Sequence, residues 1–402
     1  MTSEWHEVPL RELVGYISKG IAPSYAEEAS ETTIRVLNQK CNRNFRISYG
    51  DSRLHDTLKK KVPPERYVKP DDILINSTGA GTAGRIAQIE DVPSATTIDG
   101  HMILIRSNGK VTQKFLGYAL KAHQWEVLQL DEGSTGQTEL NRDRLLDEIM
   151  INYPVSFDEQ NAIVGTLESI DRKLIVNKEI NDNLEQQAEL LYHERFETID
   201  RDKLPVGWRI VRLGDVATIS KKSFNPAKEP EMLLEHYSIP AFDEAHFPVF
   251  EPSTAIKSNK FIVDDSCFMI SKLNPTTKRV WKPYCLTENA VCSTEFIVYK
   301  AKSQEITDFL YSVIDSASFS DFMCSHVTGS TGSRQRTTPS DTLAFELVLP
   351  NAEEIAEYQG IVSPMLEQIK CNTIENDRLK RLRDSLLPKL MSGEIDVSDI
   401  QL

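Results

Sequence analysis

Two glycine-rich stretches are the residues of this chain most able to do chemistry. GAGTAGRI at 79–86 has two glycines separated by four residues, as in a phosphate-binding loop. Such a loop also needs a lysine for the phosphates and a hydroxyl for magnesium, but Arg85 and Ile86 stand at those places. No acidic residue ~20 positions later closes a dinucleotide-binding unit either. We therefore expect neither an NTPase nor a dinucleotide site here.

The second stretch, GSTG, occurs twice, at 133–136 and at 329–332. Neither copy has the lysine or the strand–helix setting of a phosphate loop. The two copies are 196 residues apart, and Pro154 and Pro350 have the same spacing. We interpret GSTG as a turn at equivalent points of two related modules, each followed by a different polar run.

Other catalytic signatures are missing. The chain has no HExxH and no G-x-S-x-G, and its eight histidines lack the spacing of metal ligands. NPTT at 274–277 differs from the Asn-Pro-Pro-aromatic motif of an adenine methyltransferase, and PDDILIN at 70–76 lacks the downstream acid-x-Lys of a nuclease. We therefore expect no catalytic residue, no metal site and no cofactor bound by this chain.

Composition indicates an ordinary globular protein of two or three domains. It has 402 residues, 40% hydrophobic and 26% charged. No apolar run could span a bilayer and the N-terminus is no signal peptide, so we expect no membrane contact. The six scattered cysteines indicate free thiols in the cytoplasm. The formal charge is −14, yet residues 35–66 contain nine basic and three acidic residues. Binding depends on such local patches rather than on net charge.

The sequence contains an internal duplication. Residues 5–20 resemble 208–223, and Trp5 and Trp208 are expected to anchor the two module cores. The acid-led strand DDILINSTG at 71–79 corresponds to DDSCFMISK at 264–272. Two further strand pairs follow, 101–107 with 295–301 and 149–154 with 345–350. The order is module, helix, module, helix, with boundaries at 1–155, 156–200, 201–350 and 351–402.

Each module precedes a long helical pattern. The helices share the stretches EINDNL at 179–184 and IENDRL at 374–379. The spacing of the first is that of a coiled-coil seam, and its asparagines should align the two helices. At ~1.5 Å per residue, 35–40 residues make a spacer of about 55 Å. The expected packing residues are Ile163, Leu167, Ile170, Leu174, Asn177, Asn181 and Leu184 in the first helix, with Leu379 and Leu386 in the second.

Over essentially its full length the chain resembles the DNA-specificity subunit of type I restriction–modification systems. The matching features are W-x2-V-x-L opening each half, DDILINSTGAGTAGR, GSTG-x8-L-x-x-I, DEQNAIVGTLESIDRK and the ending LLPKLMSGEIDV. The resemblance implies an α+β fold with two similar α/β target-recognition domains, separated by two long helices that pair as an antiparallel coiled coil. Such subunits have no catalytic residues of their own.

The resemblance also implies partners. Each domain would read one half of a bipartite double-stranded DNA target, and the helices would dock two methyltransferase subunits. Restriction/translocase subunits would join for cleavage, and S-adenosylmethionine would bind in the methyltransferase subunit. FMISKLNPTTKRV replaces INSTGAGTAGRI in the second module. Contacts therefore do not carry over between modules residue by residue.

The candidate DNA contacts are basic, hydroxyl and amide side chains of the expected loops, since these contact phosphates and base edges. In the first module they are Lys19, Ser77, Thr78, Arg85, Ser134, Thr135, Gln137 and Arg142. In the second module they are Lys221, Lys272, Lys278, Arg279, Ser330, Thr331, Arg334 and Arg336. Alanine at Arg334 or Arg336 should weaken binding at one base position if the contact is to a base, and across all sequences if it is to a phosphate.

Two alternatives remain open from the sequence. One is an interaction scaffold whose two duplicated modules bind something other than DNA, and the other is a methyltransferase with unrecognised motifs. Retention on DNA that falls steeply with salt would exclude the first. Methyl transfer by the purified chain alone would support the second. If the helices are a ruler, four inserted residues should change the preferred half-site gap by about two base pairs.

Overall fold

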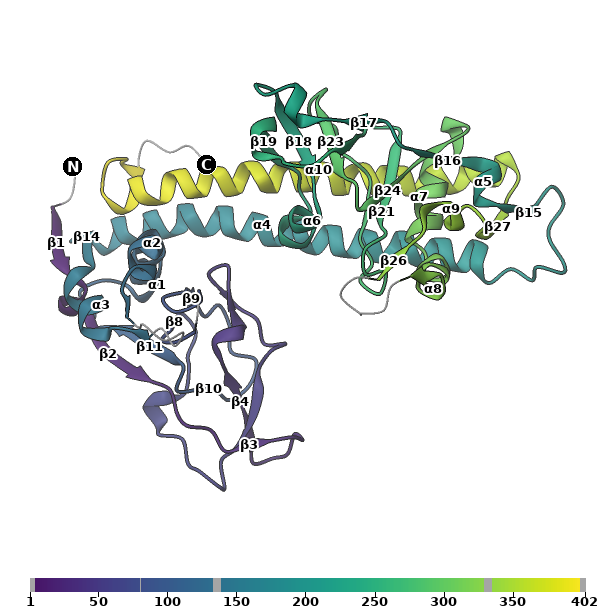
Figure 1. The fold of residues 1–402 in the computed structure, drawn as a ribbon. Helices are drawn as coiled ribbons and strands as arrows, with labels where there is room; N and C mark the ends of the chain where they lie inside the picture. Colours follow the sequence, from purple (N-terminus) through teal and green to yellow (C-terminus); the bar gives the residue numbers. More distant parts are fainter. Residues whose placement is uncertain (1–3, 80, 133–138, 329–334, 398–402) are drawn as a thin grey trace. The chain divides into compact units, whose positions relative to one another are not determined.

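The computed structural model describes residues 4–79, 81–132, 139–328 and 335–397. It divides into two compact units. Unit 1 comprises Met1–Arg172 with Lys380–Leu402, and unit 2 comprises Lys173–Leu379. Each unit contains one module built mainly of short strands, together with one stretch of each of two long helices, α4 and α10 (Figure 1).

The module of unit 1 has two four-stranded sheets and a terminal strand pair. β1 pairs antiparallel with β14, so that the two ends of the module lie side by side. The sheets have the strand orders β2-β11-β8-β9 and β10-β4-β7-β3. The strands are β1 (Trp5–Pro9), β2 (Val14–Lys19), β3 (Tyr25–Ala26), β4 (Thr33–Leu37), β5 (Asn42–Arg43), β6 (Arg46–Ile47), β7 (Arg53–Asp56), β8 (Ile73–Asn76), β9 (Ile86–Gln88), β10 (Thr96–Ile98), β11 (Met102–Ser107), β12 (Asp131–Glu132), β13 (Glu139–Leu140) and β14 (Met150–Pro154). The helices are α1 (Gln113–Ala122), α2 (Gln124–Leu128) and α3 (Arg142–Glu148).

The module of unit 2 repeats the terminal strand pair and the first four-stranded sheet, but its second sheet has five strands in a different order. β15 pairs with β27, and the sheets have the orders β16-β24-β21-β22 and β17-β20-β23-β18-β19. The strands are β15 (Arg209–Arg212), β16 (Ala217–Ser220), β17 (Ser223–Phe224), β18 (Leu233–Tyr237), β19 (Val249–Pro252), β20 (Lys260–Ile262), β21 (Cys267–Ser271), β22 (Val280–Trp281), β23 (Ala290–Ser293), β24 (Phe296–Ala301), β25 (Val327–Thr328), β26 (Arg336–Thr337) and β27 (Glu346–Leu349). Its helices are α5 (Leu213–Val216), α6 (Ile239–Ala245), α7 (Thr307–Asp315), α8 (Ala317–Ser325) and α9 (Pro339–Thr342).

Strand register corrects one detail of the sequence alignment. β8 pairs with β11 so that Asn76 faces Met102, and β21 pairs with β24 so that Ser271 faces Phe296. Asn76 is therefore equivalent to Ser271, two residues away from the match that aligned the acid pairs at 71–72 and 264–265. The acids lie outside the ladders, so the backbone pairing of the strands, rather than the acid pair, sets the equivalence.

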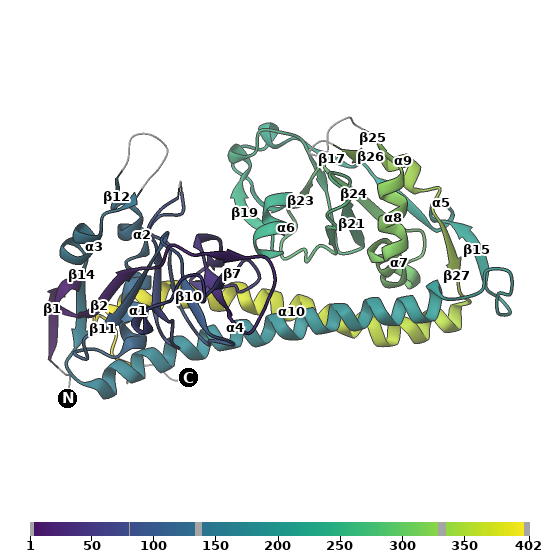
Figure 2. The ribbon, with the colours of Figure 1, turned by 90° about the horizontal axis from the view of Figure 1, so that it is seen from below.

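The two helical patterns form α4 (Phe157–Tyr192), continued by a π-helical segment (His193–Glu197), and α10 (Ala352–Met391). Within unit 2 the two helices run side by side in both views (Figures 1 and 2). Asn177 donates to Asn376, and Asn372 donates to Asn181. Partners therefore advance along α4 as they recede along α10, so the two helices are antiparallel in this unit.

The residues expected to pack between the two helices differ in how far they are buried. Ile163, Leu167, Ile170, Asn177 and Asn181 are buried. Leu174, Leu184, Leu379 and Leu386 are half-buried. Each unit contains one stretch of α4 and one of α10, and apolar side chains of these stretches pack into the core of the module in that unit. Leu387 and Leu390 join the unit 1 core with Ile163 and Leu167, whereas Ala188, Tyr192, Tyr358 and Val362 join that of unit 2.

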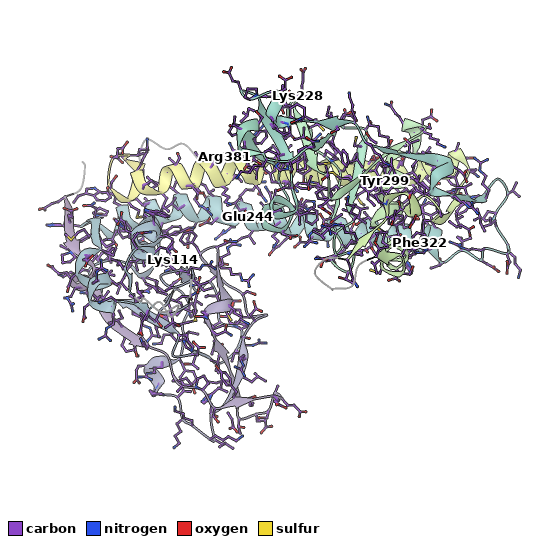
Figure 3. The ribbon with its side chains drawn as sticks, in the orientation of Figure 1. Lys114, Lys228, Glu244, Tyr299, Phe322 and Arg381 are labelled. Atoms are coloured by element: carbon purple, nitrogen blue, oxygen red, sulfur yellow. The ribbon has the colours of Figure 1, made fainter. Side chains whose placement is uncertain are left out.

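The two module-opening tryptophans pack as expected. Trp5 lies against the unit 1 core, and its Nε1 donates to Glu159 at 3.2 Å. Trp208 lies against the unit 2 core, with its ring 5.7 Å from that of Phe196. A side-chain contact also joins α1 to α4, since the amine of Lys114 lies 2.6 Å from Glu168. Lys114 is labelled in Figure 3. In the described part of the chain, no helix is long and apolar enough to cross a membrane.

Candidate nucleic-acid interface

In the first module, the loop that follows β8 collects several predicted contacts. The amide of Ser77 donates to His101, and its carbonyl accepts from Leu140, each at 2.8 Å. Thr78 forms a β-bridge with Glu139, and its hydroxyl lies 2.8 Å from Nδ1 of His101. The loop after β8 is thus held against the strand that follows the first GSTG. Ser77 is fully buried and supports this frame through its backbone.

Lys19 and Arg85 lie on the same frame. Lys19, the last residue of β2, forms an ion pair with Glu139. The carbonyl of Arg85 accepts from the amide of Asn76 at 2.9 Å, and its guanidinium donates to the carbonyl of Gly81 at 3.2 Å. Four of the predicted first-module residues (Lys19, Ser77, Thr78 and Arg85) are therefore brought to one place.

Arg85 opens onto a cleft of about 600 Å³ that sequence reasoning did not identify. Its lining contains three basic residues (Lys40, Arg43 and Arg85), and no acidic residue among those described. Lys40 and Arg43 are exposed and form no ion pair with any described residue. Amide side chains of Gln39, Asn42, Asn44 and Gln124 line the rest with Phe45. Cations with amide donors and acceptors are the side chains that bind phosphates and base edges.

Side-chain hydrogen bonds of Asn42 and Gln124 hold the backbone beneath the cleft. Asn42 is fully buried, and its Nδ2 donates to Oδ1 of Asn76 at 3.2 Å and to the carbonyl of Arg85 at 2.8 Å. Gln124 accepts from the amide of Ile86 and donates to the carbonyl of Gly84. The buried amide of Asn42 and the half-buried amide of Gln124 therefore hold the loop that carries Arg85.

A strained turn forms one lip of the cleft. Asn44 and Phe45 join β5 to β6 with φ of 52° and 62°. Two consecutive left-handed residues are typical of a tight hairpin turn, in which asparagine is common but a bulky residue such as phenylalanine is costly. The amine of Lys121 lies 5.1 Å from the centre of the Phe45 ring. Strain of this kind tends to persist at functional sites.

The second module builds the same frame with other side chains. The amide of Lys272 donates to Glu295 at 2.9 Å, and its carbonyl accepts from Thr337 at 3.1 Å. Leu273 forms a β-bridge with Arg336. The guanidinium of Arg336 lies 2.9 Å from Glu295, which holds the pKa of this arginine above its usual value. The structure thus brings Lys272 and Arg336 together.

Two other second-module candidates are engaged within the protein. Nζ of Lys278 lies 3.2 Å from Glu189 on α4 and 3.1 Å from Asp315 on α7. Burial would lower the pKa of Lys278, but the two carboxylates raise it overall. Arg279 forms a two-point contact with Asp243 at 2.5 and 2.8 Å. Sequence reasoning missed these acids because they lie 36 to 89 residues away in the chain.

At one pair of equivalent positions, the side chains of the two modules carry opposite charges. Glu139 in the first module corresponds to Arg336 in the second, since each bridges the residue after the loop-opening position. His101 likewise corresponds to Glu295, since each carbonyl accepts the loop-opening amide. The first module therefore has an acid where the second has a base. Hydrogen bonds of the main chain are conserved, and side chains differ.

The remaining candidates fall elsewhere. Arg142 begins α3 and is exposed, and Lys221 is exposed just after β16. Ser134, Thr135, Gln137, Ser330, Thr331 and Arg334 lie outside the described residues. Across the described ranges, no three His, Cys, Asp or Glu residues gather as metal ligands would. The six cysteines, all within those ranges, are free thiols.

Comparison with known proteins finds similarity to one class of DNA-specificity subunits. The profile described as "Type I restriction modification DNA specificity domain" matches residues 2–186. A curated relative, the type I restriction enzyme MjaIX specificity subunit of Methanocaldococcus jannaschii, is 26% identical over 381 residues, which cover 88% of this chain and 84% of the relative. The first module and much of α4 are thus similar to the DNA specificity domain of type I restriction–modification systems, and most of the chain is similar to a specificity subunit.

Two further likenesses concern a short segment of the sequence and the fold. The HindI specificity subunit of Haemophilus influenzae is 33% identical over 92 residues, which cover 23% of this chain and 20% of that protein. The crystal structure of the type I system S subunit from M. genitalium has the same fold, with a TM-score of 0.62 at 14% identity, covering 97% of this chain and 99% of that one. Specificity subunits are non-catalytic, in agreement with the expectation from sequence.

Proposed function

We propose that this chain reads a bipartite double-stranded DNA sequence, with one half-site for each module. The observation that carries the proposal is the pair of matching frames with different side chains. A conserved hydrogen-bond frame places Glu139 and Arg336 at equivalent points, next to loops of different sequence. Two half-sites of different sequence require this combination, because base readout depends on side chains while phosphate contacts fix the docking.

In the first module the cleft at Lys40, Arg43 and Arg85 is the proposed DNA contact. Lys40 and Arg43 have no ion-pair partner among described residues, so no salt bridge must break when they meet a phosphate. Arg43 stands in the β5–β6 hairpin, and Arg85 in the loop after β8. The amide side chains between them have the hydrogen-bonding groups that read base edges.

In the second module Arg336 is the proposed contact, and Glu295 holds it in place. The pair lies at the surface, where an ion pair contributes little and can exchange for a phosphate or a guanine. Lys278 and Arg279, which are paired with acids in this structure, would contact DNA only after those pairs break.

We further propose that the two helices form one antiparallel coiled coil that spaces the modules and docks two methyltransferase subunits, with restriction/translocase subunits completing a cytoplasmic complex. The domain boundaries then follow the sequence division at residues 155, 200 and 350. S-adenosylmethionine would bind the methyltransferase subunits. The antiparallel hydrogen bonds between α4 and α10 within unit 2 support this arrangement.

Methylome sequencing tests the function. A host that expresses this chain with its methyltransferase partner should show one bipartite methylated motif. Exchange of residues 272–279, with the matching loop of a relative, should change one half of the motif and leave the other half intact. No retention on DNA even at low salt, or no sequence-specific methylation in the presence of the partner, would favour the alternative of a scaffold that binds no DNA.

A pair of variants tests Arg336 itself. Arg336→Ala should weaken DNA binding, whereas Glu295→Gln should preserve or strengthen it, because the guanidinium loses its competing carboxylate. If the ion pair served only to hold the fold, both variants would weaken binding to the same extent. Binding should be measured by fluorescence anisotropy on the complex with methyltransferase subunits, across a salt series.

A further inference from the structure

One position of the backbone frame beside the loops proposed to contact DNA has opposite charge in the two modules. β12 and β13 form a short antiparallel pair, and so do β25 and β26. The second residue of β13 and of β26 donates its amide to the carbonyl of the residue that opens the loop after β8 or after β21. The first residue is Glu139 in β13 and Arg336 in β26. Strand pairing and hydrogen bonds therefore make these two residues equivalent.

A neighbouring lysine is common to both modules. Lys19 and Lys221 each directly follow the residue that faces the third position of β11 or of β24. In the first module this lysine forms an ion pair with Glu139. In the second module, Arg336 has its ion pair with Glu295 instead. The surrounding frame is therefore the same, and the charge at this one position is reversed.

Both ion pairs lie at the surface. The side chain of Glu139 is 56% exposed, and that of Arg336 is 43% exposed. Exposed ion pairs contribute little to stability, because water already solvates both charges and the paired side chains lose freedom. The needs of the fold therefore do not explain the choice of charge at this position. Each side chain can instead exchange its partner for a group of a bound molecule.

The position of Glu139 limits what it can contact. It forms a β-bridge with Thr78, and the next residue, Gly79, lines the basic cleft proposed to bind DNA. A carboxylate there repels phosphate and only accepts hydrogen bonds, so its partner on a duplex must be a base amine. In the major groove cytosine presents its N4 amine alone, whereas adenine presents the acceptor N7 beside its amine. A carboxylate therefore suits cytosine better than adenine.

We propose that Glu139 reads a cytosine in the half-site of the first module, and that Arg336 reads a guanine at the equivalent point of the other half-site. The carboxylate of Glu139 accepts a hydrogen bond from the N4 amine of the cytosine. The guanidinium of Arg336 donates to O6 and N7 of the guanine. This inference rests on the proposed function and adds which base each module reads at this point of the frame.

Base analogues that preserve Watson–Crick pairing test the first contact. Methylome sequencing supplies the target duplex, and the exchange of residues 272–279 assigns its halves to the modules. N4-methylcytosine lacks the N4 hydrogen that faces the major groove. At one cytosine of the first half-site it should weaken binding of the wild-type complex with methyltransferase subunits about tenfold or more, the usual size of one good base contact. The same analogue should cause no further loss in Glu139→Ala.

The second contact has a matching analogue. 7-Deazaguanine lacks the N7 acceptor, and at one guanine of the other half-site it should weaken wild-type binding several-fold. It should cause no further loss in Arg336→Ala. A 7-deazaguanine penalty that persists unchanged in Arg336→Ala overturns the assignment of guanine to this residue.

Two further variants separate base reading from a structural role. Glu12→Ala is the matched control, because Glu12 is 52% exposed and lies 3.3 Å from Lys110 in an ion pair outside the frame. It should retain the full sensitivity to N4-methylcytosine. Glu139→Gln should broaden the methylated motif at this position from cytosine to include adenine, since an amide accepts from N6 and donates to N7.

Failure of this inference is distinguishable from failure of the proposed function. Sequence-specific binding in which Glu139→Ala keeps every N4-methylcytosine penalty of the wild type overturns the cytosine contact and leaves the proposed function standing. Absence of sequence-specific binding by the wild-type complex overturns both. Fluorescence anisotropy on duplexes that carry one analogue at a time measures all of these penalties.

Discussion

Nδ2 of Asn177 on α4 donates to Oδ1 of Asn376 on α10 at 2.9 Å, inside the stretch of unit 2 where the two helices pack together. The same Nδ2 lies 2.7 Å from Glu375. One turn further along α4, Asn181 accepts from Asn372 at 2.8 Å. Asn177 and Asn181 are both buried. Side-chain amides that meet across an otherwise apolar seam satisfy each other only in one alignment, so they specify the register of the helix pair.

Replacement of this first amide pair should raise stability and loosen register. Oδ1 of Asn177 is buried with no acceptor role among the described residues, which is a cost that leucine would remove. We expect Asn177→Leu with Asn376→Leu to raise the free energy of unfolding by about 1–2 kcal/mol, measured by urea titration. Spin labels on the two helices of unit 2 should show one distance in the wild type and several in the double variant.

The single variant Asn177→Leu provides the contrast. It leaves Asn376 facing an apolar side chain, with one remaining bond to the carbonyl of Leu174 at 3.4 Å. We expect it to lose about 1–2 kcal/mol, the cost of a polar group deprived of its partner. A single narrow spin-label distance in the double variant would show that the asparagines do not set the register.

Asp171 supports a second buried polar cluster, in unit 1. Its carboxylate lies 2.9 Å from Tyr118, 3.1 Å from Lys121 and 2.9 Å from Arg383, so it joins α1, α4 and α10. Burial alone would raise the pKa of Asp171, but Lys121, Arg383 and Tyr118 lower it overall. Burial lowers the pKa of Lys121. Asp171 raises this pKa, but the positive charge of Arg383 offsets part of that effect.

Asp171→Asn should therefore leave two cations without a counter-charge and cost about 3 kcal/mol of stability at pH 7. Since the pKa of Asp171 is lowered on folding, its stabilisation is complete above the unfolded pKa of about 4 and is lost as pH falls through the folded value. The difference between variant and wild type should therefore shrink below pH 4. Asp384→Asn, which removes the exposed neighbour of Arg383, should cost less than about 0.5 kcal/mol. Equal losses in both variants would contradict a special role for Asp171.

The basic cleft of the first module gives a prediction on DNA affinity. Lys40→Ala and Arg43→Ala should each weaken binding to all DNA sequences and reduce the slope of log affinity against log salt by about one. Lys178→Ala, an exposed lysine of α4 outside the cleft, is the control and should change neither quantity. Anisotropy titrations of the complex with methyltransferase subunits would measure both. An unchanged salt slope in both cleft variants would place the DNA elsewhere.

How much of this could be read from sequence depends on the range of the interactions. The strands at 149–154 and 345–350 and both long helices were predictable, because short apolar runs and seven-residue spacing are local patterns. Lys19, Ser77, Thr78 and Arg85 do meet on one frame. The cleft was not predictable, since Gln124 on α2 completes a site that begins at Gln39. The basic run at 35–66 was the available signal for Lys40 and Arg43.

In the second module, two residues that the sequence suggested were available for DNA are paired within the structure. Lys278 and Arg279 looked available for DNA because no acid stands beside them in sequence. Folding brings Glu189, Asp315 and Asp243 against them from α4, α7 and α6. Charge balance at a surface is decided by tertiary neighbours, which a local count cannot include. The shift of two residues between the aligned acid pairs has a related cause, because strand pairing rather than residue identity fixes equivalence.

The register of the helix pair also allows a more specific test of the proposal that the helices set the half-site spacing. Four inserted residues turn a helix by about 40° beyond a full turn, which would move the asparagines off the seam. Seven residues inserted after Leu174 in α4, with seven more before Leu379 in α10, keep both amide layers paired. Such a matched insertion lengthens the pair by about 10 Å, equal to about three base pairs of DNA. If the chain reads two half-sites, methylome sequencing should return the same half-sites with a gap about three base pairs longer.

The insertion in α4 alone should destabilise the chain instead, because its helices can no longer pair on both sides of the insert. Recovery of the original gap from the matched insertion would show that the helices do not set the spacing.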